Sequence, residues 1–137
     1  MPRVRRFVFL AAAAGFLLAG CVAPGGRHGV VAGPRGYVEV GLASWYGMDR
    51  GRVKEHGGAT ASGRPFDQNA LTAAHKTLPL GSRVKVTNLE NGRTLVVVIN
   101  DRGPYISGRI IDMTLRGARI LGFKEAGTAK VRIEALP

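Results

Sequence analysis

The carboxyl group best placed for acid chemistry is that of Asp101. It follows the apolar run of residues 96–99 and precedes the Gly103-Pro104 pair, which predicts a strand end beside a turn. If the strands close into a barrel, this carboxyl group lies at its mouth and is partly desolvated. Desolvation favours the protonated form that a general acid needs. The other interpretation is that Asp101 pairs with Arg102 or caps the turn.

Three more side chains are candidates for the same chemistry. His75 either hydrogen-bonds a carboxylate or packs inside the domain. Asp67 is either a site residue or the N-cap of a helical turn that begins near Asn69. Asp112 is better suited to capping a helix than to catalysis.

An aromatic pair, Trp45 and Tyr46, lies at the end of a predicted strand, and Trp45 is the only tryptophan. Adjacent strand residues point to opposite faces, so one ring can enter the core while the other faces a groove. An aromatic ring beside a groove suits the apolar face of a sugar. The alternative is that both rings belong to the core.

Patterns of apolar residues predict the strands that position these side chains. Apolar and polar residues alternate with a period of two over residues 38–43, 83–87 and 130–134. The apolar run within residues 94–99 is continuous, which suits a strand covered on both faces. Asn91-Gly92 precedes that strand and predicts a hairpin turn.

One short helix is predicted over residues 114–121. Asp112 or Thr114 caps its start, and Gly122 ends it in the left-handed conformation. A second helical turn is expected near residues 69–71. These elements together predict a compact, mostly β domain, and closing it into a barrel would leave no exposed strand edge.

Composition narrows the possible partners. The chain of 137 residues has a formal net charge of +11 and a single cysteine, Cys21. A basic protein prefers anionic partners, but scattered cations without an interleaved aromatic stripe argue against nucleic acid. The histidines, at positions 28, 56 and 75, show no metal-ligand spacing, so neither a metal nor another cofactor is expected.

The first 20 residues have the pattern of a secretion signal. Three arginines precede an apolar stretch over residues 7–19, which is shorter than the ~20 residues of a membrane-spanning helix. The Leu-Ala-Gly-Cys ending resembles the lipobox of bacterial lipoproteins, which implies cleavage before Cys21 and lipid on that residue. Residues 21–40 then form a tether rich in Gly and Pro.

Four ordered blocks resemble the rare lipoprotein A family. They are Ala-Ser-Trp-Tyr-Gly, Thr-Ala-x-Gly-x-x-Phe-Asp, Ala-Ala-His-Lys-Thr-Leu-Pro-Leu-Gly and Asn-Asp-Arg-Gly-Pro. The resemblance implies a six-stranded double-psi β-barrel with one or two short helices over residues 41–137. It also implies a peptidoglycan ligand, and several members are lytic transglycosylases, which are lyases. Many members continue into a SPOR domain, and we expect none here.

The resemblance also implies roles for individual residues. Asp101, His75 and Asp67 correspond to polar positions of the family blocks, with Asp101 as the acid and the other two orienting it. Many members carry Glu where this chain has Arg64. Glu55 is a weak candidate to replace that carboxylate. Glycan contacts are expected from Trp45, Tyr46, Arg64 and Arg102.

Three functional hypotheses follow. The first is an endolytic transglycosylase that cleaves the bond between N-acetylmuramic acid and N-acetylglucosamine and leaves a 1,6-anhydro end. The second is a glycan-binding lipoprotein without turnover, and the third is a lipoprotein partner of another envelope protein. In each case we expect a monomer, held by lipid on Cys21, with the outer membrane facing the periplasm as the location.

Overall fold

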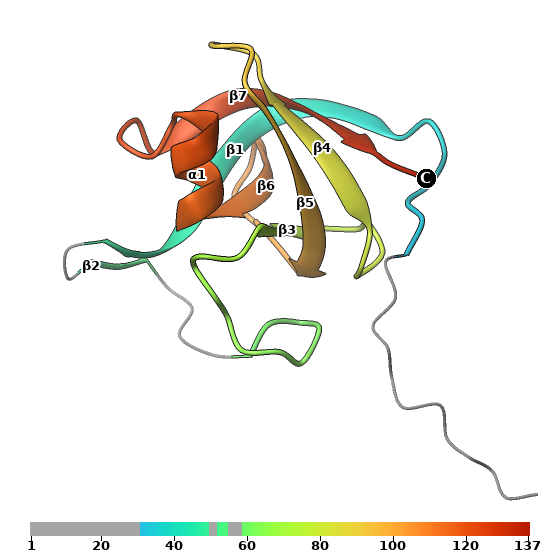
Figure 1. Ribbon diagram of the computed structural model, residues 1–137, viewed down its shortest axis with the longest axis horizontal. Helices are drawn as coiled ribbons and strands as arrows, with labels where there is room; N and C mark the ends of the chain where they lie inside the picture. Colours follow the sequence, from blue (N-terminus) through green and yellow to red (C-terminus); the bar gives the residue numbers. More distant parts are fainter. Residues whose placement is uncertain (1–30, 50–51, 55–58) are drawn as a thin grey trace, which may run out of the picture.

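The computed structural model describes residues 31–49, 52–54 and 59–137. Seven strands and one helix lie within these residues (Figure 1): β1 (Val38–Asp49), β2 (Arg52–Lys54), β3 (Thr72–His75), β4 (Arg83–Asn88), β5 (Thr94–Asp101), β6 (Arg109–Thr114), α1 (Leu115–Leu121) and β7 (Thr128–Ala135).

Six of the strands close into a barrel. Their order is β1-β6-β3-β5-β4-β7, and β7 pairs with β1 to complete the circle. β1 is parallel to β6 and β3 is parallel to β5, whereas the other barrel pairs are antiparallel. The short strand β2 pairs only with β1, outside the barrel. The predicted six-stranded double-psi barrel is therefore confirmed.

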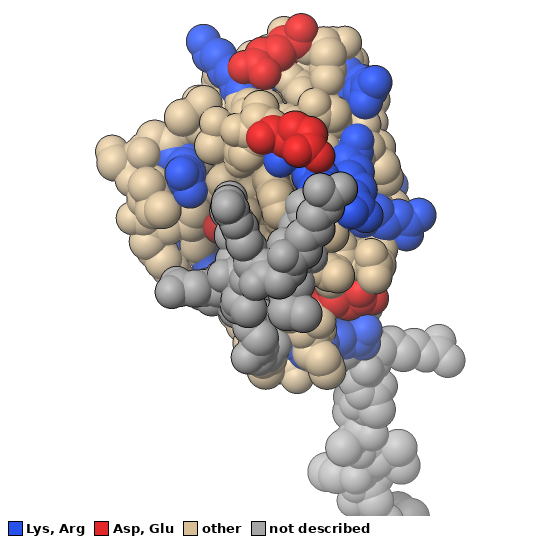
Figure 2. Space-filling model, turned by 90° about the vertical axis from the view of Figure 1, so that its left-hand side faces the viewer, with Lys and Arg blue, Asp and Glu red and all other residues tan. Residues whose placement is uncertain are grey.

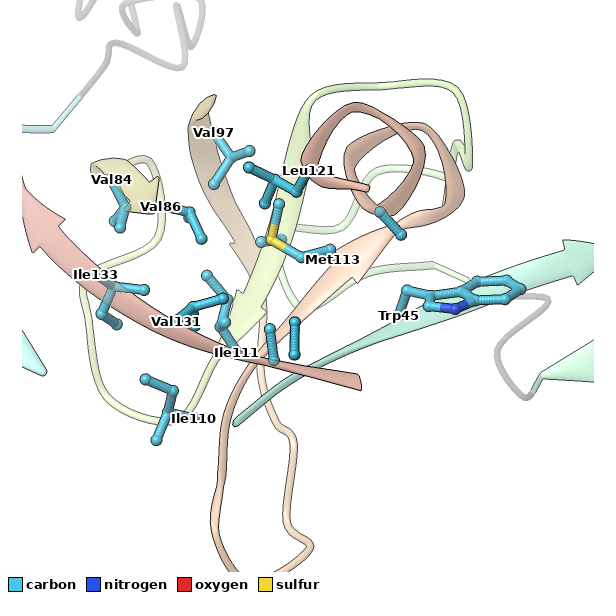
Figure 3. Packing of buried hydrophobic residues seen from close by; sticks show 14 of the residues in the cluster. Trp45, Val84, Val86, Val97, Ile110, Ile111, Met113, Leu121, Val131 and Ile133 are labelled. Atoms are coloured by element: carbon cyan, nitrogen blue, oxygen red, sulfur yellow. The ribbon is translucent and has the colours of Figure 1, made fainter. Parts of the chain in front are cut away.

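Every second residue of the barrel strands faces the core. Val84 and Val86 of β4, Val97 of β5, and Val131 and Ile133 of β7 are almost completely buried. Figure 3 shows these side chains converging with Ile111 and Met113 of β6, while Trp45 lies toward the margin of the cluster. The alternation seen in the sequence therefore separates core side chains from those on the outer wall.

Helix α1 begins and ends at the predicted residues. Thr114 is the N-cap, and its hydroxyl accepts a hydrogen bond from the amide of Gly117 at 3.1 Å. Gly122 ends the helix with a φ of 80°, a conformation that glycine adopts without a Cβ clash. Leu115, Ala118 and Leu121 form its buried face.

Three local features differ from the sequence prediction. Strands β3 and β6 were not indicated by alternation, because both of their faces are covered. The β4–β5 hairpin keeps its Asn-Gly pair, but four residues, 89–92, separate Asn88 from Arg93, whose carbonyl accepts the Asn88 amide at 2.8 Å. The segment near residues 69–71 is a turn and not a helix.

The described residues that precede β1, 31–37, contact the barrel. Val31 donates its amide to the Gly81 carbonyl at 2.9 Å, and Gly33 donates to Leu136 at 3.1 Å. Both belong to the segment predicted as a tether. Cys21 and the predicted signal lie outside the described residues. Within the described part, no helix has the length and apolar character needed to cross a membrane.

Candidate functional site

Asp101 and Asp112 lie on the two strands that flank β3. Strand β3 lies between β5 and β6, and its residue Ala74 pairs with Asp101 on one side and with Asp112 on the other. The register of β3 with β5 shifts by one residue between Ala73 and Ala74, which marks a β-bulge at the level of Asp101. The Cα atoms of the two acidic residues are therefore ~10 Å apart, two strand spacings.

Backbone amides hold the Asp101 carboxylate in place. Its Oδ1 accepts hydrogen bonds from the amides of Ala61 and Arg102, both at 2.9 Å. The amide of Ser62 also donates to the Asn100 carbonyl at 3.0 Å, which fixes the turn of residues 60–64 against the end of β5. Among the described residues both bonds fall on Oδ1, so Oδ2 is the oxygen available for proton transfer.

Tyr46 is a buried phenol on β1. Its ring packs on Phe66, with the ring centroids 4.6 Å apart. Burial raises the pKa of the Tyr46 phenol far above its usual value, and the charges of Asp101 and Asp112 raise it further. The phenol therefore stays protonated and lies within electrostatic reach of both acids.

Asp112 does not cap α1. Its Oδ1 instead accepts a hydrogen bond from the Ser44 hydroxyl, its register partner on β1. The sequence prediction preferred a capping role, which Thr114 takes instead. Asp112 and Asp101 are brought within two strands of each other by β3, which pairs with both β5 and β6. This pairing joins segments far apart in the chain, so the local sequence pattern did not reveal the arrangement.

The turns around Arg64 and Asp67 are exposed. The Arg64 carbonyl accepts hydrogen bonds from the amide and hydroxyl of Thr60, which tie this cation to the turn that holds Asp101. The Asp67 carboxylate accepts the amide of Asn69 at 2.8 Å and so caps a turn. The sequence had offered Asp67 as the N-cap of a helical turn at this position. No described hydrogen bond links the Asp67 side chain to Asp101.

His75 is the last residue of β3 and is buried. Its Nδ1 accepts the amides of Thr77 and Leu78 at 3.1 and 3.0 Å, so Nε2 carries the proton. Nε2 lies 3.2 Å from the Glu39 carboxylate, which also accepts the Tyr37 hydroxyl at 2.5 Å. The carboxylate that His75 meets is therefore that of Glu39, and no described hydrogen bond joins His75 to Asp101.

We expect His75 to make the stability of the fold depend on pH. Burial lowers its folded pKa from the usual 6.5, Glu39 opposes this, and Arg102 and Lys76 add to it. A lowered folded pKa contributes stability that is complete above the unfolded value of 6.5 and is lost as the pH falls through the folded pKa. The free energy of unfolding, measured by urea denaturation, should therefore fall as the pH drops below about 6.5, and His75→Gln should flatten that slope.

Two of the predicted glycan contacts are buried. Trp45 is 9% exposed, faces the core (Figure 3), and donates its indole N–H to the Lys124 carbonyl at 3.0 Å. Tyr46 is 5% exposed and packs on Phe66. The core alternative therefore holds for Trp45, which belongs to the buried cluster, whereas Tyr46 is buried outside that cluster against Phe66.

Arg102 is engaged by the backbone. Its Nη1 donates to the carbonyls of Leu78 at 2.7 Å and His75 at 3.2 Å. A charged donor with two carbonyl acceptors is a strong anchor. Arg102 therefore joins the base of the β5–β6 loop to the β3–β4 connection, a role different from the predicted glycan contact.

The remaining observations concern Glu55, possible metal ligands and the charges on the surface. Glu55 lies outside the described residues. Within those residues no group of three or more His, Cys, Asp or Glu side chains is placed to hold a metal ion. On the face in Figure 2, Lys and Arg side chains are interspersed with Asp and Glu.

Comparisons with known proteins match this arrangement. The family model described as lytic transglycolase matches residues 38–133. A Pseudomonas aeruginosa protein named "Endolytic peptidoglycan transglycosylase RlpA" is 52% identical over 102 residues, covering 74% of this chain and 28% of that protein. A Vibrio cholerae protein of the same name is 48% identical over 112 residues, covering 82% and 41%. The chain thus spans well under half the length of these relatives.

Solved structures support the same barrel. The Streptomyces papain inhibitor superposes with a TM-score of 0.58 at 23% identity and covers 76% of this chain and 98% of its own. A Clavibacter michiganensis expansin superposes with a TM-score of 0.55 at 20% identity and covers 74% and 51%. At this identity the likeness concerns the fold alone.

Proposed function

Because the chain belongs to the lytic transglycolase family, as the match over residues 38–133 and the 52% identical relative show, we propose that it is an endolytic peptidoglycan transglycosylase. The observation that carries this proposal is the placement of Asp101. It is the last residue of β5, its Oδ1 is fixed by two amides, and it lies within the Asn-Asp-Arg-Gly-Pro block.

One carboxyl group can serve both steps of such a reaction. In the first step, Asp101 donates its proton through Oδ2 to the glycosidic oxygen, and the bond to C1 of N-acetylmuramic acid breaks. In the second, the resulting carboxylate accepts the proton of the C6 hydroxyl while that oxygen bonds to C1. The product is a 1,6-anhydro ring, no water is consumed, and Asp101 regains its proton.

The neighbouring groups support this chemistry. Asp112 is a second carboxylate, two strands from Asp101 and held by Ser44, and its charge favours the positive character that develops at C1. Tyr46 remains a neutral hydroxyl near both acids. The three groups come from different strands, so the barrel itself sets their spacing.

Attachment and location extend the proposal. We propose that lipid on Cys21 anchors the chain to the outer membrane, facing the periplasm, and that it acts there as a monomer. The Leu-Ala-Gly-Cys sequence and the absence of Asp at position 22 support this placement. Incorporation of labelled palmitate, lost in Cys21→Ser, tests the anchor.

Mass spectrometry of sacculi digested by the purified chain tests the activity. Soluble fragments that end in 1,6-anhydro-N-acetylmuramic acid are expected. Fragments with reducing ends would indicate hydrolysis instead. Binding to sacculi without any fragment would contradict the proposal and favour a glycan-binding lipoprotein, with Arg64 in place of the usual Glu as the physical reason.

We expect Arg64 to contribute electrostatic attraction to the anionic wall. Its side chain is exposed on the turn whose Ala61 amide binds Asp101. Arg64→Ala should weaken binding to sacculi about threefold at low salt and have less effect at high salt, because exposed charges are screened. A pelleting assay at two salt concentrations measures this. Lys130→Ala, an exposed cation on β7 across the barrel from β3, is the matched control.

A further inference from the structure

Tyr105 is the one strongly exposed aromatic side chain among the described residues. It is 78% exposed, and the next residue, Ile106, is 57% exposed; no other large hydrophobic side chain in the described part is as exposed as either. Trp45, Tyr46 and Phe123 are buried, and Tyr37 and Phe66 are partly buried. A ring available for stacking on an external ligand is therefore found only at position 105 within the described residues.

The loop that carries Tyr105 is firmly held at its base. Gly103 and Pro104 are buried, and the side chain of Arg102, directly before them, is anchored to the carbonyls of His75 and Leu78. After the exposed tip, the Arg109 amide donates to the Ile106 carbonyl at 3.2 Å. The loop thus presents its two apolar side chains from a fixed base, which reduces the entropy lost when a ligand binds.

The backbone turns at Gly103, shortly before the exposed part of the loop. Gly103 has a φ of +112°, in the region that L side chains rarely adopt. A Cβ built there would lie 3.7 Å from Cε2 of Tyr105, so the ring leans back over this residue. One edge of the ring therefore has a fixed neighbour, while most of its surface remains open to solvent.

The loop and Asp101 lie at the same end of the barrel. β3 and β5 are parallel, so their last residues, His75 and Asp101, share one end. β6 is antiparallel to β3 and starts at that end with Arg109, so the connection 102–108 lies there as well. Tyr105 follows Asp101 by only a few residues along the chain, which limits their Cα distance to at most about 14 Å.

We propose that Tyr105 and Ile106 form a saccharide-binding subsite. The Tyr105 ring stacks on the apolar face of a sugar, and Ile106 contacts an N-acetyl methyl group of the same glycan strand that passes Asp101. This inference rests on the proposed function, because it takes the β-linked amino-sugar strand as the ligand. The evidence for the subsite is separate from that for the activity. It consists of the exposure of the two side chains, the fixed base of their loop, and the barrel end that the loop shares with Asp101.

Stacking at such a subsite contributes to binding and not to proton transfer. Tyr105→Ala should raise the apparent Kd for sacculi about tenfold, the loss expected when one aromatic contact is removed. The maximal rate at saturating sacculi should stay within about twofold, because Asp101 is untouched. Tyr105→Phe keeps the ring and should bind like the parent chain.

The experiment combines a pelleting curve with the rate of formation of 1,6-anhydro ends, using the purified chain and isolated sacculi. Leu89→Ala is the matched control, because Leu89 is 46% exposed on the β4–β5 turn at the opposite barrel end. The melting temperature of each variant checks the fold, which a highly exposed side chain is not expected to support.

The outcomes separate the two proposals. Weaker binding in Tyr105→Ala alone supports the subsite, even if the parent chain yields no anhydro product and the proposed activity therefore fails. Unchanged binding in Tyr105→Ala overturns the subsite, whether or not product forms. Equal losses in Tyr105→Ala and Tyr105→Phe also overturn it, since the hydroxyl and not the ring would then be the contact.

Discussion

Asp101→Asn should reduce the formation of 1,6-anhydro ends by about a thousandfold or more, within the range of general acid catalysis. An amide cannot protonate the glycosidic oxygen or accept the proton of the C6 hydroxyl. It can still accept the amides of Ala61 and Arg102 through its own oxygen, so the turn of residues 60–64 should stay in place. Quantifying anhydro ends by mass spectrometry over time measures the loss.

Two controls make this result specific. The variant should bind sacculi with nearly the parent affinity and melt within a few degrees of the parent chain. Glu90→Gln, an exposed carboxylate on the β4–β5 turn at the other barrel end, should leave turnover unchanged. Turnover retained in Asp101→Asn would show that another group is the acid, and Asp112→Asn would then be the next variant to measure.

The sequence predicted the regular parts of the fold because they follow local rules. The period of two in β4 and β7 marks residues that alternate between core and solvent. Thr114 and Gly122 mark the ends of α1 by capping chemistry that depends only on neighbouring residues. β3 and β6 could not be predicted from alternation, because both strands are covered on both faces.

The candidate site was predicted less completely, since it depends on strand order. Asp101 stood out because a carboxylate follows an apolar strand. Its proximity to Asp112 comes from β3 pairing with both strands, which no local pattern encodes. His75, the next residue of β3 after Ala74, meets Glu39. Glu39 carried no signal of its own, because it lies in an ordinary alternating strand.

The solvent exposure of each aromatic side chain also changes the role expected for it. The sequence favoured Trp45 and Tyr46 because two adjacent rings suggest a groove. The barrel instead uses Trp45 in its core and packs Tyr46 beneath the segment that holds Phe66. Tyr105 belongs to a block noted for its Asp and Gly-Pro pair, and only the structure reveals that its ring is open.

Trp45→Ala should lower the free energy of unfolding by about 3–5 kcal/mol, the usual cost of deleting a large buried ring. The substitution also leaves the Lys124 carbonyl without the indole N–H that lies 3.0 Å away. Urea denaturation followed by circular dichroism measures the change. For a domain of this size such a loss removes much of the total stability.

Comparing Trp45→Ala with Trp45→Phe and Tyr105→Ala distinguishes a core residue from a glycan contact. Trp45→Phe keeps most of the buried ring and should cost less, with the lost hydrogen bond contributing about 1 kcal/mol. Tyr105→Ala should change stability by less than about 0.5 kcal/mol and act on sacculus binding instead. A Trp45→Ala chain with near-parent stability but weakened binding would reverse this assignment and place the glycan against β1.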